Sequence, residues 1–401
     1  MDSHVIVGAG LTGAKAAETL RAEGFTGRVV LVGAEPDLPY ERPPLSKGYL
    51  LGQDDRASVF VHDEKWYAEQ KIEVLTGRRV TALDRAAHEI ELAGGERLGY
   101  TKLLLATGAS PRRLRVPGND LKGVHYLRRL AHADRLRDAL AAGGRVVVAG
   151  AGWIGLETAA AARTYGCEVT IVEPGPSPLH ATLGPELGEY FADLHRRHGV
   201  DLRLGTGVQG FAGDGAVSAV WTDAGDIPAD VVIVGIGARP ETQLASDAGL
   251  AVDDGVCVDA ALRTEDPDIF AAGDVASAWH PGYDRRIRVE HWAAATNGGP
   301  AAARSMLGRE VVHDDLPYFF SDQYDVGMEF TGWFPPGGYD RVVKRGTDEA
   351  FHAFWLAGGR VVAGLHVNQW DEGLDAVREL IRSGRTVDPE ELADPARPLP
   401  S

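Results

Sequence analysis

Two segments of the chain share one pattern of apolar and polar positions. HVIVGAGLTGAKAAETL (4–20) precedes RVVLVGAE (28–35), and RVVVAGAGWIGLETAAAARTYG (145–166) precedes EVTIVE (168–173). In each pair, a short apolar run predicts a buried β-strand, glycines predict a turn, and small residues predict a closely packed helix. A second apolar run then predicts a strand that ends in a carboxylate. The pattern therefore predicts two βαβ units.

Each predicted turn carries the spacing GxGxxG. The glycines are Gly8, Gly10 and Gly13 in the first segment and Gly150, Gly152 and Gly155 in the second. The first glycine permits the tight turn, the second lets the backbone approach a pyrophosphate, and the third lets the helix pack on the strand. Glu35 and Glu173 follow about 20 residues later, as expected for an acid that binds a ribose. Two complete fingerprints predict two dinucleotide sites.

The remaining apolar runs predict the domain organisation. LLLATGAS (103–110) and ADVVIVGIGARP (229–240) predict strands ending in glycine and proline loops, where the chain changes domain. We expect an α/β fold in which one Rossmann-like domain is inserted into another and a C-terminal α+β domain follows. The expected boundaries are 1–113 and 244–316 for the first domain, 114–243 for the inserted domain and 317–401 for the C-terminal domain.

The C-terminal domain has a different pattern. Three antiparallel strands are predicted at 339–346, 350–359 and 360–368, and a helix at 371–384. The polar, proline-rich tail at 389–401 predicts an extended or frayed end.

Composition narrows the class of protein. A chain of 401 residues with 44% apolar and 25% charged residues is typical of a globular protein of two or three domains. No apolar run reaches the length of a membrane span, and the N-terminus enters a strand directly, so we expect no leader and a cytoplasmic protein. A net charge of −17 without a basic stretch argues against a nucleic-acid partner. Two cysteines are too few for a disulfide scaffold or a four-cysteine metal site.

Asp274 indicates which dinucleotide occupies the N-terminal site. It follows an apolar strand and Gly273 in DIFAAGDVA (268–276). A carboxylate at this position can accept hydrogen bonds from flavin ribityl hydroxyls; taken alone, it can equally be a helix N-cap. With two fingerprints, FAD is favoured in the N-terminal site and NAD(P) in the inserted domain.

Six segments in chain order resemble one family. They are PYERPPLSKGYLLG (39–52), LLLATGASPRRL (103–114), GAGWIGLE (150–157), DIFAAGDVA (268–276), RVEHW (288–292) and PYFFSDQYD (317–325). They resemble the FAD-dependent NADH:ferredoxin reductases of the putidaredoxin reductase, rubredoxin reductase and dioxygenase ferredoxin reductase type. The resemblance implies a glutathione-reductase-like arrangement of the two nucleotide domains.

The resemblance also implies residue roles. Glu35 would bind the adenosine ribose of FAD, while Arg42 and Lys47 would lie near the pyrophosphate and the isoalloxazine. Glu157 would pair with Lys47 and approach the nicotinamide, which makes these two the candidate catalytic residues. Trp292 would line the flavin edge. The alternatives are a solvated loop lysine, a carboxylate favoured by the helix dipole and a core tryptophan.

Further cofactor contacts follow from the same resemblance. They are Thr12, Val80, Thr107, Gly108, Arg128, Ile154, Gly235, Gly237, Glu290 and His291. The segment from Pro36 to Gly52 has no cysteine, and Cys167 and Cys257 lie far apart as small apolar strand residues. Dithiol chemistry is therefore not expected, and electrons would leave the flavin to a protein with a one-electron centre.

The second site favours NADH. Glu173 can bind both ribose hydroxyls and repels a 2′-phosphate. Between Glu173 and Leu183 there is no lysine or arginine, only His180, whereas family members often have an arginine there.

The sequence thus predicts an NADH-dependent reductase of a [2Fe–2S] ferredoxin that serves a cytochrome P450 or an oxygenase. The alternatives are an NADH oxidase, a nitrite-reductase-type flavoprotein, or a redox-sensing flavoprotein similar to apoptosis-inducing factor. Arg285, Arg286 and Arg288 precede Trp292 and are a candidate docking patch for the acidic ferredoxin; a solvated charged hairpin is the alternative.

Overall fold

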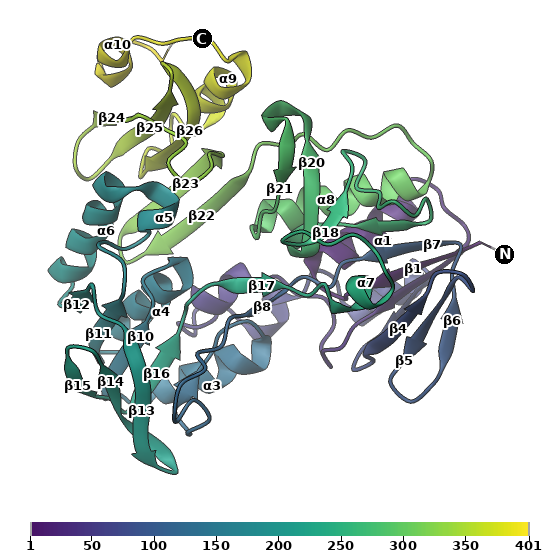
Figure 1. Cartoon of the computed structure of the whole chain (residues 1–401), viewed down its shortest axis with the longest axis horizontal. Helices are drawn as coiled ribbons and strands as arrows, with labels where there is room; N and C mark the ends of the chain where they lie inside the picture. Colours follow the sequence, from purple (N-terminus) through teal and green to yellow (C-terminus); the bar gives the residue numbers. More distant parts are fainter. Residues whose placement is uncertain (1, 400–401) are drawn as a thin grey trace. The chain divides into compact units, whose positions relative to one another are not determined.

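The chain folds into two compact units, both assembled from separate stretches of sequence (Figure 1). The structure is a computed structural model and describes residues 2–399. The first unit contains the chain up to Glu41, Ala57–Ser110 and Arg239–Phe319. The second unit contains Arg42–Arg56, Pro111–Ala238 and the chain from Phe320 onward. The chain passes between the units near β8 (Ala109–Pro111) and β17 (Ala238–Pro240).

The first unit is built on a parallel sheet in the order β19-β7-β1-β2-β3. Its strands are β1 (Ser3–Val7), β2 (Arg28–Val32), β3 (Ile72–Leu75), β7 (Lys102–Leu105) and β19 (Ile269–Ala271). They are apolar and largely buried, as expected of a sheet covered on both faces. Helix α1 (Leu11–Ala22) joins β1 to β2 and packs on α8 (Trp292–Met306). This packing is close, because a Cβ at Gly299 would lie 2.5 Å from the Thr12 carbonyl oxygen.

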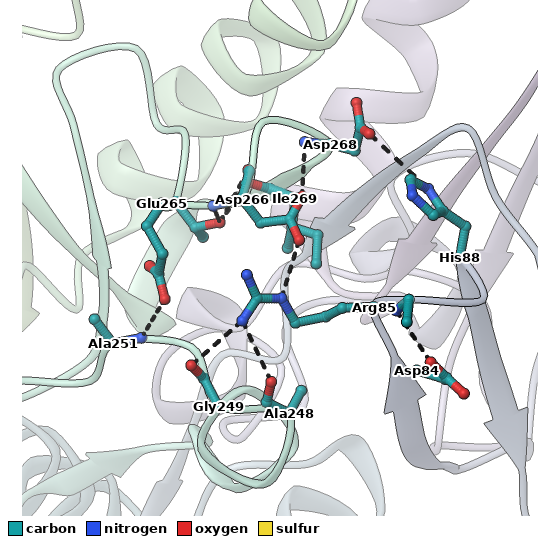
Figure 2. Close-up of polar contacts among 12 residues, drawn as sticks. Asp84, Arg85, His88, Ala248, Gly249, Ala251, Glu265, Asp266, Asp268 and Ile269 are labelled. Atoms are coloured by element: carbon teal, nitrogen blue, oxygen red, sulfur yellow. Dashed lines mark hydrogen bonds and ion pairs between the residues drawn. The ribbon is translucent and has the colours of Figure 1, made fainter.

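Smaller elements complete the first unit. They are α2 (Glu64–Glu69), β4 (Val80–Asp84), β5 (Glu89–Leu92), β6 (Arg97–Gly99), α7 (Gln243–Asp247), β18 (Val256–Val258), β20 (Ala276–His280) and β21 (Arg285–Ile287). Figure 2 shows how Arg85, after β4, ties two distant stretches together. Its Nε donates to Asp266 at 2.9 Å, and one terminal nitrogen donates to the Gly249 carbonyl at 3.4 Å.

The second unit repeats the parallel design in the order β12-β11-β10-β16-β9. Its elements are β9 (Val124–His125), α3 (Leu130–Ala141), β10 (Arg145–Ala149), α4 (Trp153–Thr164), β11 (Glu168–Glu173), α5 (His180–Leu183), α6 (Pro185–Arg197), β12 (Asp201–Leu204) and β16 (Val231–Val234). A separate antiparallel sheet contains β13 (Val208–Asp214), β14 (Ala216–Thr222) and β15 (Gly225–Pro228). The fold predicted from the two βαβ patterns is confirmed.

The C-terminal part of the second unit is a five-stranded sheet in the order β22-β23-β26-β25-β24. Its elements are β22 (Tyr318–Gln323), β23 (Val326–Gly332), β24 (Arg341–Gly346), β25 (Phe351–Ala357), β26 (Arg360–Val367), α9 (Asp375–Ser383) and α10 (Pro389–Ala393). The three predicted strands and the predicted helix are all present. No helix within residues 2–399 is long and apolar enough to cross a membrane.

The expectation of an extended tail is wrong for α10. Asp388 caps this helix by accepting from the Glu390 amide, Pro389 occupies its first turn, and Leu392 is fully buried. Arg345 donates to the carbonyl groups of Asp394 and Arg397 and so holds the segment that follows. Residues 400 and 401 of the predicted tail lie outside the described residues.

Candidate functional site

The first glycine loop has the geometry that a pyrophosphate requires. Gly8 has φ +122°, and a Cβ there would lie 2.0 Å from the Ala106 carbonyl oxygen. A Cβ at Gly13 would lie 2.1 Å from the Gly8 carbonyl oxygen. A Cβ at Gly10 would meet nothing within 4 Å. The outer glycines are therefore needed for packing, whereas Gly10 leaves open the space that a phosphate group would take.

The start of α1 completes this cradle. Gly10 is the N-cap residue, no side chain caps the helix, and its first turn has no acidic residue. The helix dipole and the amide groups of the first turn therefore favour an anion there. Gly273 approaches the same turn closely, since a Cβ on it would lie 2.3 Å from Thr12 Oγ1. This contact brings the turn that contains Asp274 beside the start of α1.

The two predicted FAD carboxylates lie in the first unit. Glu35 follows β2, and its Oε2 accepts a 2.6 Å hydrogen bond from the Tyr40 hydroxyl, which orients the carboxylate. Asp274 lies in the short 3-10 turn Gly273–Val275, whose N-cap is Ala272. The N-cap alternative for Asp274 is therefore wrong. Both residues follow parallel strands at their carboxyl ends, the edge where such sheets bind nucleotides.

The start of α8 carries the predicted flavin-edge residues. Trp292 is half-buried, and its indole N–H donates to Glu41 Oε2 at 3.2 Å. His291 packs against the Phe319 ring, and burial lowers the pKa of His291 to about 4. Glu290 accepts from Arg288. The indole is thus held by a polar contact at the helix start.

Arg288 does not belong to a docking patch. Its side chain is 11% exposed and forms ion pairs with Asp254 and Glu290, so little of it faces solvent. Arg285 and Arg286 are exposed on β21. The candidate patch is therefore reduced to two arginines.

The second glycine loop repeats the geometry of the first. Gly150 has φ +102°, and a Cβ there would lie 2.5 Å from the Gly235 carbonyl oxygen. A Cβ at Gly155 would lie 2.0 Å from the Gly150 carbonyl oxygen, while a Cβ at Gly152 would meet nothing closer than 3.9 Å. Ile154, in the first turn of α4, is 40% exposed. This loop therefore fits a second pyrophosphate.

Glu173 is fixed at this second loop. Its Oε2 accepts from the Ala151 amide at 2.8 Å and its Oε1 from the Gly175 amide at 2.7 Å. Each carboxylate oxygen can accept a further hydrogen bond, so the Glu173 carboxylate remains able to bind ribose hydroxyls. His180, the only basic residue of the following segment, is exposed at the start of α5.

Lys47 and Glu157 form a buried ion pair in the second unit. Lys47 Nζ lies 2.7 Å from Glu157 Oε1, and the two side chains are 15% and 3% exposed. Ser46 donates to Glu157 Oε2 at 2.5 Å, and Ser321 donates to Oε1 at 2.7 Å. The alternative of a solvated loop lysine is therefore wrong, and the sequence prediction of a Lys47–Glu157 pair is confirmed.

The other predicted contact residues are distributed over both units. In the first unit, Val80 begins β4, Thr107 donates to the Glu241 carbonyl at 2.7 Å, and Gly108 has φ +70°. In the second unit, Arg42 donates to the Arg128 carbonyl. Gly235 packs on the Gly155 amide, and Gly237 has φ +91°.

Ser46 and Ser321 were not predicted as site residues, although both lie in segments that carry the family resemblance. A signal was present in β22, where Ser321 and Gln323 alternate with other residues and are each 1% exposed. Buried polar side chains in a strand require partners. Cys167 is buried just before β11 and Cys257 lies in β18, and both are free thiols. Within residues 2–399 no cluster of three potential ligands is placed to hold a metal ion.

The fold and the two glycine loops define a two-dinucleotide oxidoreductase. A family model described as pyridine nucleotide-disulphide oxidoreductase matches residues 2–299, and one described as reductase C-terminal matches residues 318–401. The chain therefore belongs to the pyridine nucleotide-disulphide oxidoreductase family, and within it to the ferredoxin reductases.

Relatives and solved structures agree along the whole chain. The chain is 43% identical to the ferredoxin–NAD(+) reductase component of an anthranilate 1,2-dioxygenase system from Burkholderia cepacia, over 98% of this chain and 97% of that protein. It is 40% identical to rhodocoxin reductase from Rhodococcus erythropolis, over 98% of this chain and 92% of that protein. Putidaredoxin reductase in its covalent complex with putidaredoxin superposes with a TM-score of 0.95 and 38% identity, over 99% of this chain and 97% of that chain.

Proposed function

We propose that this protein binds FAD, oxidises NADH and delivers electrons singly to a [2Fe–2S] ferredoxin that serves a cytochrome P450 or an oxygenase. The observation that carries the proposal is the full-length similarity to ferredoxin reductases, which extends through the C-terminal part of the chain. Because NADH is the proposed reductant, we also infer a cytoplasmic location.

The first unit would hold FAD. The open space at Gly10 and the start of α1 would take the pyrophosphate. Glu35 would bind the adenosine ribose, and Asp274 would bind the ribityl chain. When bound, FAD supplies the capacity to accept a hydride and to release electrons one at a time. The chain's own contribution is to bind, orient and tune this group.

Lys47 would supply a fixed positive charge near the flavin, as the family resemblance implies. Glu157 holds the ammonium group in one position through the 2.7 Å ion pair. A cation beside the isoalloxazine stabilises negative charge on the reduced ring and so raises its reduction potential. The buried pair therefore supports hydride acceptance from NADH.

The second unit would hold NADH at the Gly152 loop. Glu173 would bind the ribose hydroxyls, and its fixed negative charge would repel the 2′-phosphate of NADPH. Trp292 and the exposed Arg285 and Arg286 would lie where the ferredoxin docks, as the resemblance implies for the tryptophan.

Two measurements test the proposal. The chromophore released by acid from the purified protein should be FAD, and NADH oxidation should depend on an added ferredoxin. Release of FMN would contradict the cofactor assignment. Rapid NADH oxidation in air without a carrier would favour the oxidase, and very slow flavin reduction with a change of oligomeric state would favour a redox sensor.

A further inference from the structure

A row of hydrogen bonds leads away from Glu157 through the second unit. Ser321 Oγ donates to Glu157 Oε1 at 2.7 Å, and Gln323 Nε2 donates to Ser321 Oγ at 3.1 Å. His195 Nε2 lies 2.9 Å from Gln323 Oε1, and the Tyr324 hydroxyl lies 3.2 Å from His195 Nδ1. The row joins α4, β22 and α6, which are far apart in the sequence.

The members of this row are buried where a polar group needs a partner. Ser321 and Gln323 are each 1% exposed, and His195 is fully buried. Asp322, between the two strand residues, is exposed, as the alternation of a strand requires. A buried polar group that loses its hydrogen-bond partner costs about 1–3 kcal/mol of stability. Apolar side chains at these positions would stabilise the fold without that risk. The polar residues therefore point to a role beyond packing.

The donors all point towards Glu157. An amide nitrogen only donates and an amide oxygen only accepts, so Gln323 donates to Ser321 and accepts from His195. His195 must then carry its hydrogen on Nε2, which leaves Nδ1 to accept from Tyr324. Burial lowers the pKa of His195 to about 4, in agreement with a neutral ring. Ser321, already an acceptor, has its own hydrogen directed at the carboxylate.

We propose that Ser321, Gln323 and His195 are positioning residues that fix the Glu157 carboxylate and, through it, the ammonium group of Lys47. This inference rests on the proposed function, because the value of a fixed Lys47 lies in hydride transfer to the flavin. The C-terminal sheet then does more than complete the fold: β22 sets the direction of a charge that would act on the cofactor.

The first experiment uses near-isosteric variants of Gln323 in the FAD-loaded protein. Gln323→Met removes both hydrogen bonds, and Gln323→Glu keeps an acceptor for His195 but removes the donor for Ser321. The limiting rate constant of flavin reduction by NADH should fall about tenfold in both variants, because Ser321 loses the donor that orients its hydroxyl towards the Glu157 carboxylate. The KM for NADH should change less than about twofold, since no nucleotide contact is removed.

Conservative and matched variants separate positioning from folding. His195→Gln retains an N–H donor for Gln323 and should restore most of the rate that His195→Leu loses. His352, a buried histidine of the same sheet, donates from Nε2 to the Gly373 carbonyl and lies outside this row. His352→Gln should leave the rate constant unchanged. The inference is overturned if NADH reduces the flavin of Gln323→Glu as fast as that of the wild type. It is also overturned if His352→Gln slows flavin reduction as much as the Gln323 variants do.

A second measurement is independent of NADH. Nitrogen-15 NMR of labelled histidine reports the tautomer of each ring, and the His195 signals among the 13 histidines are those that vanish in His195→Gln. A neutral ring with the hydrogen on Nε2 is expected. A hydrogen on Nδ1 would reverse the row and overturn the inference. If the NMR result holds but NADH does not reduce the wild type, the proposed function fails and the geometry stands.

Discussion

Single residues act in this protein largely through charges that the fold holds in place. Lys47 and Glu157 are buried together, whereas Lys344 and Asp348 form an ion pair of the same type with side chains 40% and 93% exposed. A buried pair is costly to break because one charge remains without a partner, while an exposed pair contributes little. The two pairs therefore form a matched comparison.

Breaking the buried pair should destabilise the protein strongly. We expect Lys47→Met to lower the free energy of unfolding by about 3–5 kcal/mol, because Glu157 is left as an uncompensated buried charge. Lys344→Met should have a far smaller effect, because Asp348 is almost fully exposed. Urea unfolding followed by circular dichroism, with flavin content measured in parallel, checks both. The double variant Lys47→Met with Glu157→Gln should be more stable than Lys47→Met alone; an additive loss would contradict the electrostatic explanation.

Glu173 should determine the choice of nucleotide. The wild type should prefer NADH to NADPH by at least about tenfold in kcat/KM, roughly 1.4 kcal/mol. Glu173→Arg should narrow that ratio, because it removes the ribose acceptor and the charge that repels a 2′-phosphate. Glu168→Arg, at the exposed start of the same strand, makes the same change of charge and should leave the ratio unaltered. Equal use of NADPH by the wild type would refute the assignment of this site.

At the scale of elements, each glycine loop divides its positions between packing and binding. Gly10→Ala should fold normally but lower FAD occupancy, because the added Cβ enters the open space at the start of α1. Gly13→Ala should lose stability or not fold, because its Cβ would lie 2.1 Å from the Gly8 carbonyl oxygen. Flavin content and thermal unfolding of both variants separate these effects. Full FAD occupancy in Gly10→Ala would contradict the placement of the pyrophosphate at this loop.

The elements of the fold differ in how far the sequence could predict them. The βαβ units were predictable because strand, glycine spacing and helix follow one another within about 30 residues. The row behind Glu157 was not, because Gln323 and His195 are 128 residues apart and nothing local links them. Helix α10 had its signals, the Asp388 cap and Pro389, but its stability depends on the burial of Leu392 and on Arg345 from a distant strand.

At the scale of the whole molecule, the net charge of −17 opposes attraction to an acidic ferredoxin. A local basic patch still acts within a Debye length, about 8 Å at physiological salt. Two exposed arginines, Arg285 and Arg286, remain from the predicted patch, since Arg288 is paired with Asp254 and Glu290.

Reversing these two charges should weaken docking without affecting the flavin. Arg285→Glu with Arg286→Glu should raise the KM for ferredoxin severalfold and flatten its salt dependence, while ferricyanide reduction stays unchanged. Arg382→Glu with Arg385→Glu, at exposed positions near the end of the chain, alters the net charge equally and serves as the control. Equal loss with both acceptors would mean that the arginines support the fold or the flavin instead.

Sequential-mixing stopped flow follows both halves of the proposed electron transfer in one experiment. The purified protein is first mixed with NADH without oxygen, and the reduced protein is then mixed with a [2Fe–2S] ferredoxin from the same genome. We expect rapid bleaching of the flavin absorbance by NADH, followed by reoxidation of the flavin as two ferredoxin molecules are reduced for each NADH consumed. A flavin that NADH reduces but no ferredoxin reoxidises, while oxygen or nitrite does so rapidly, would contradict it.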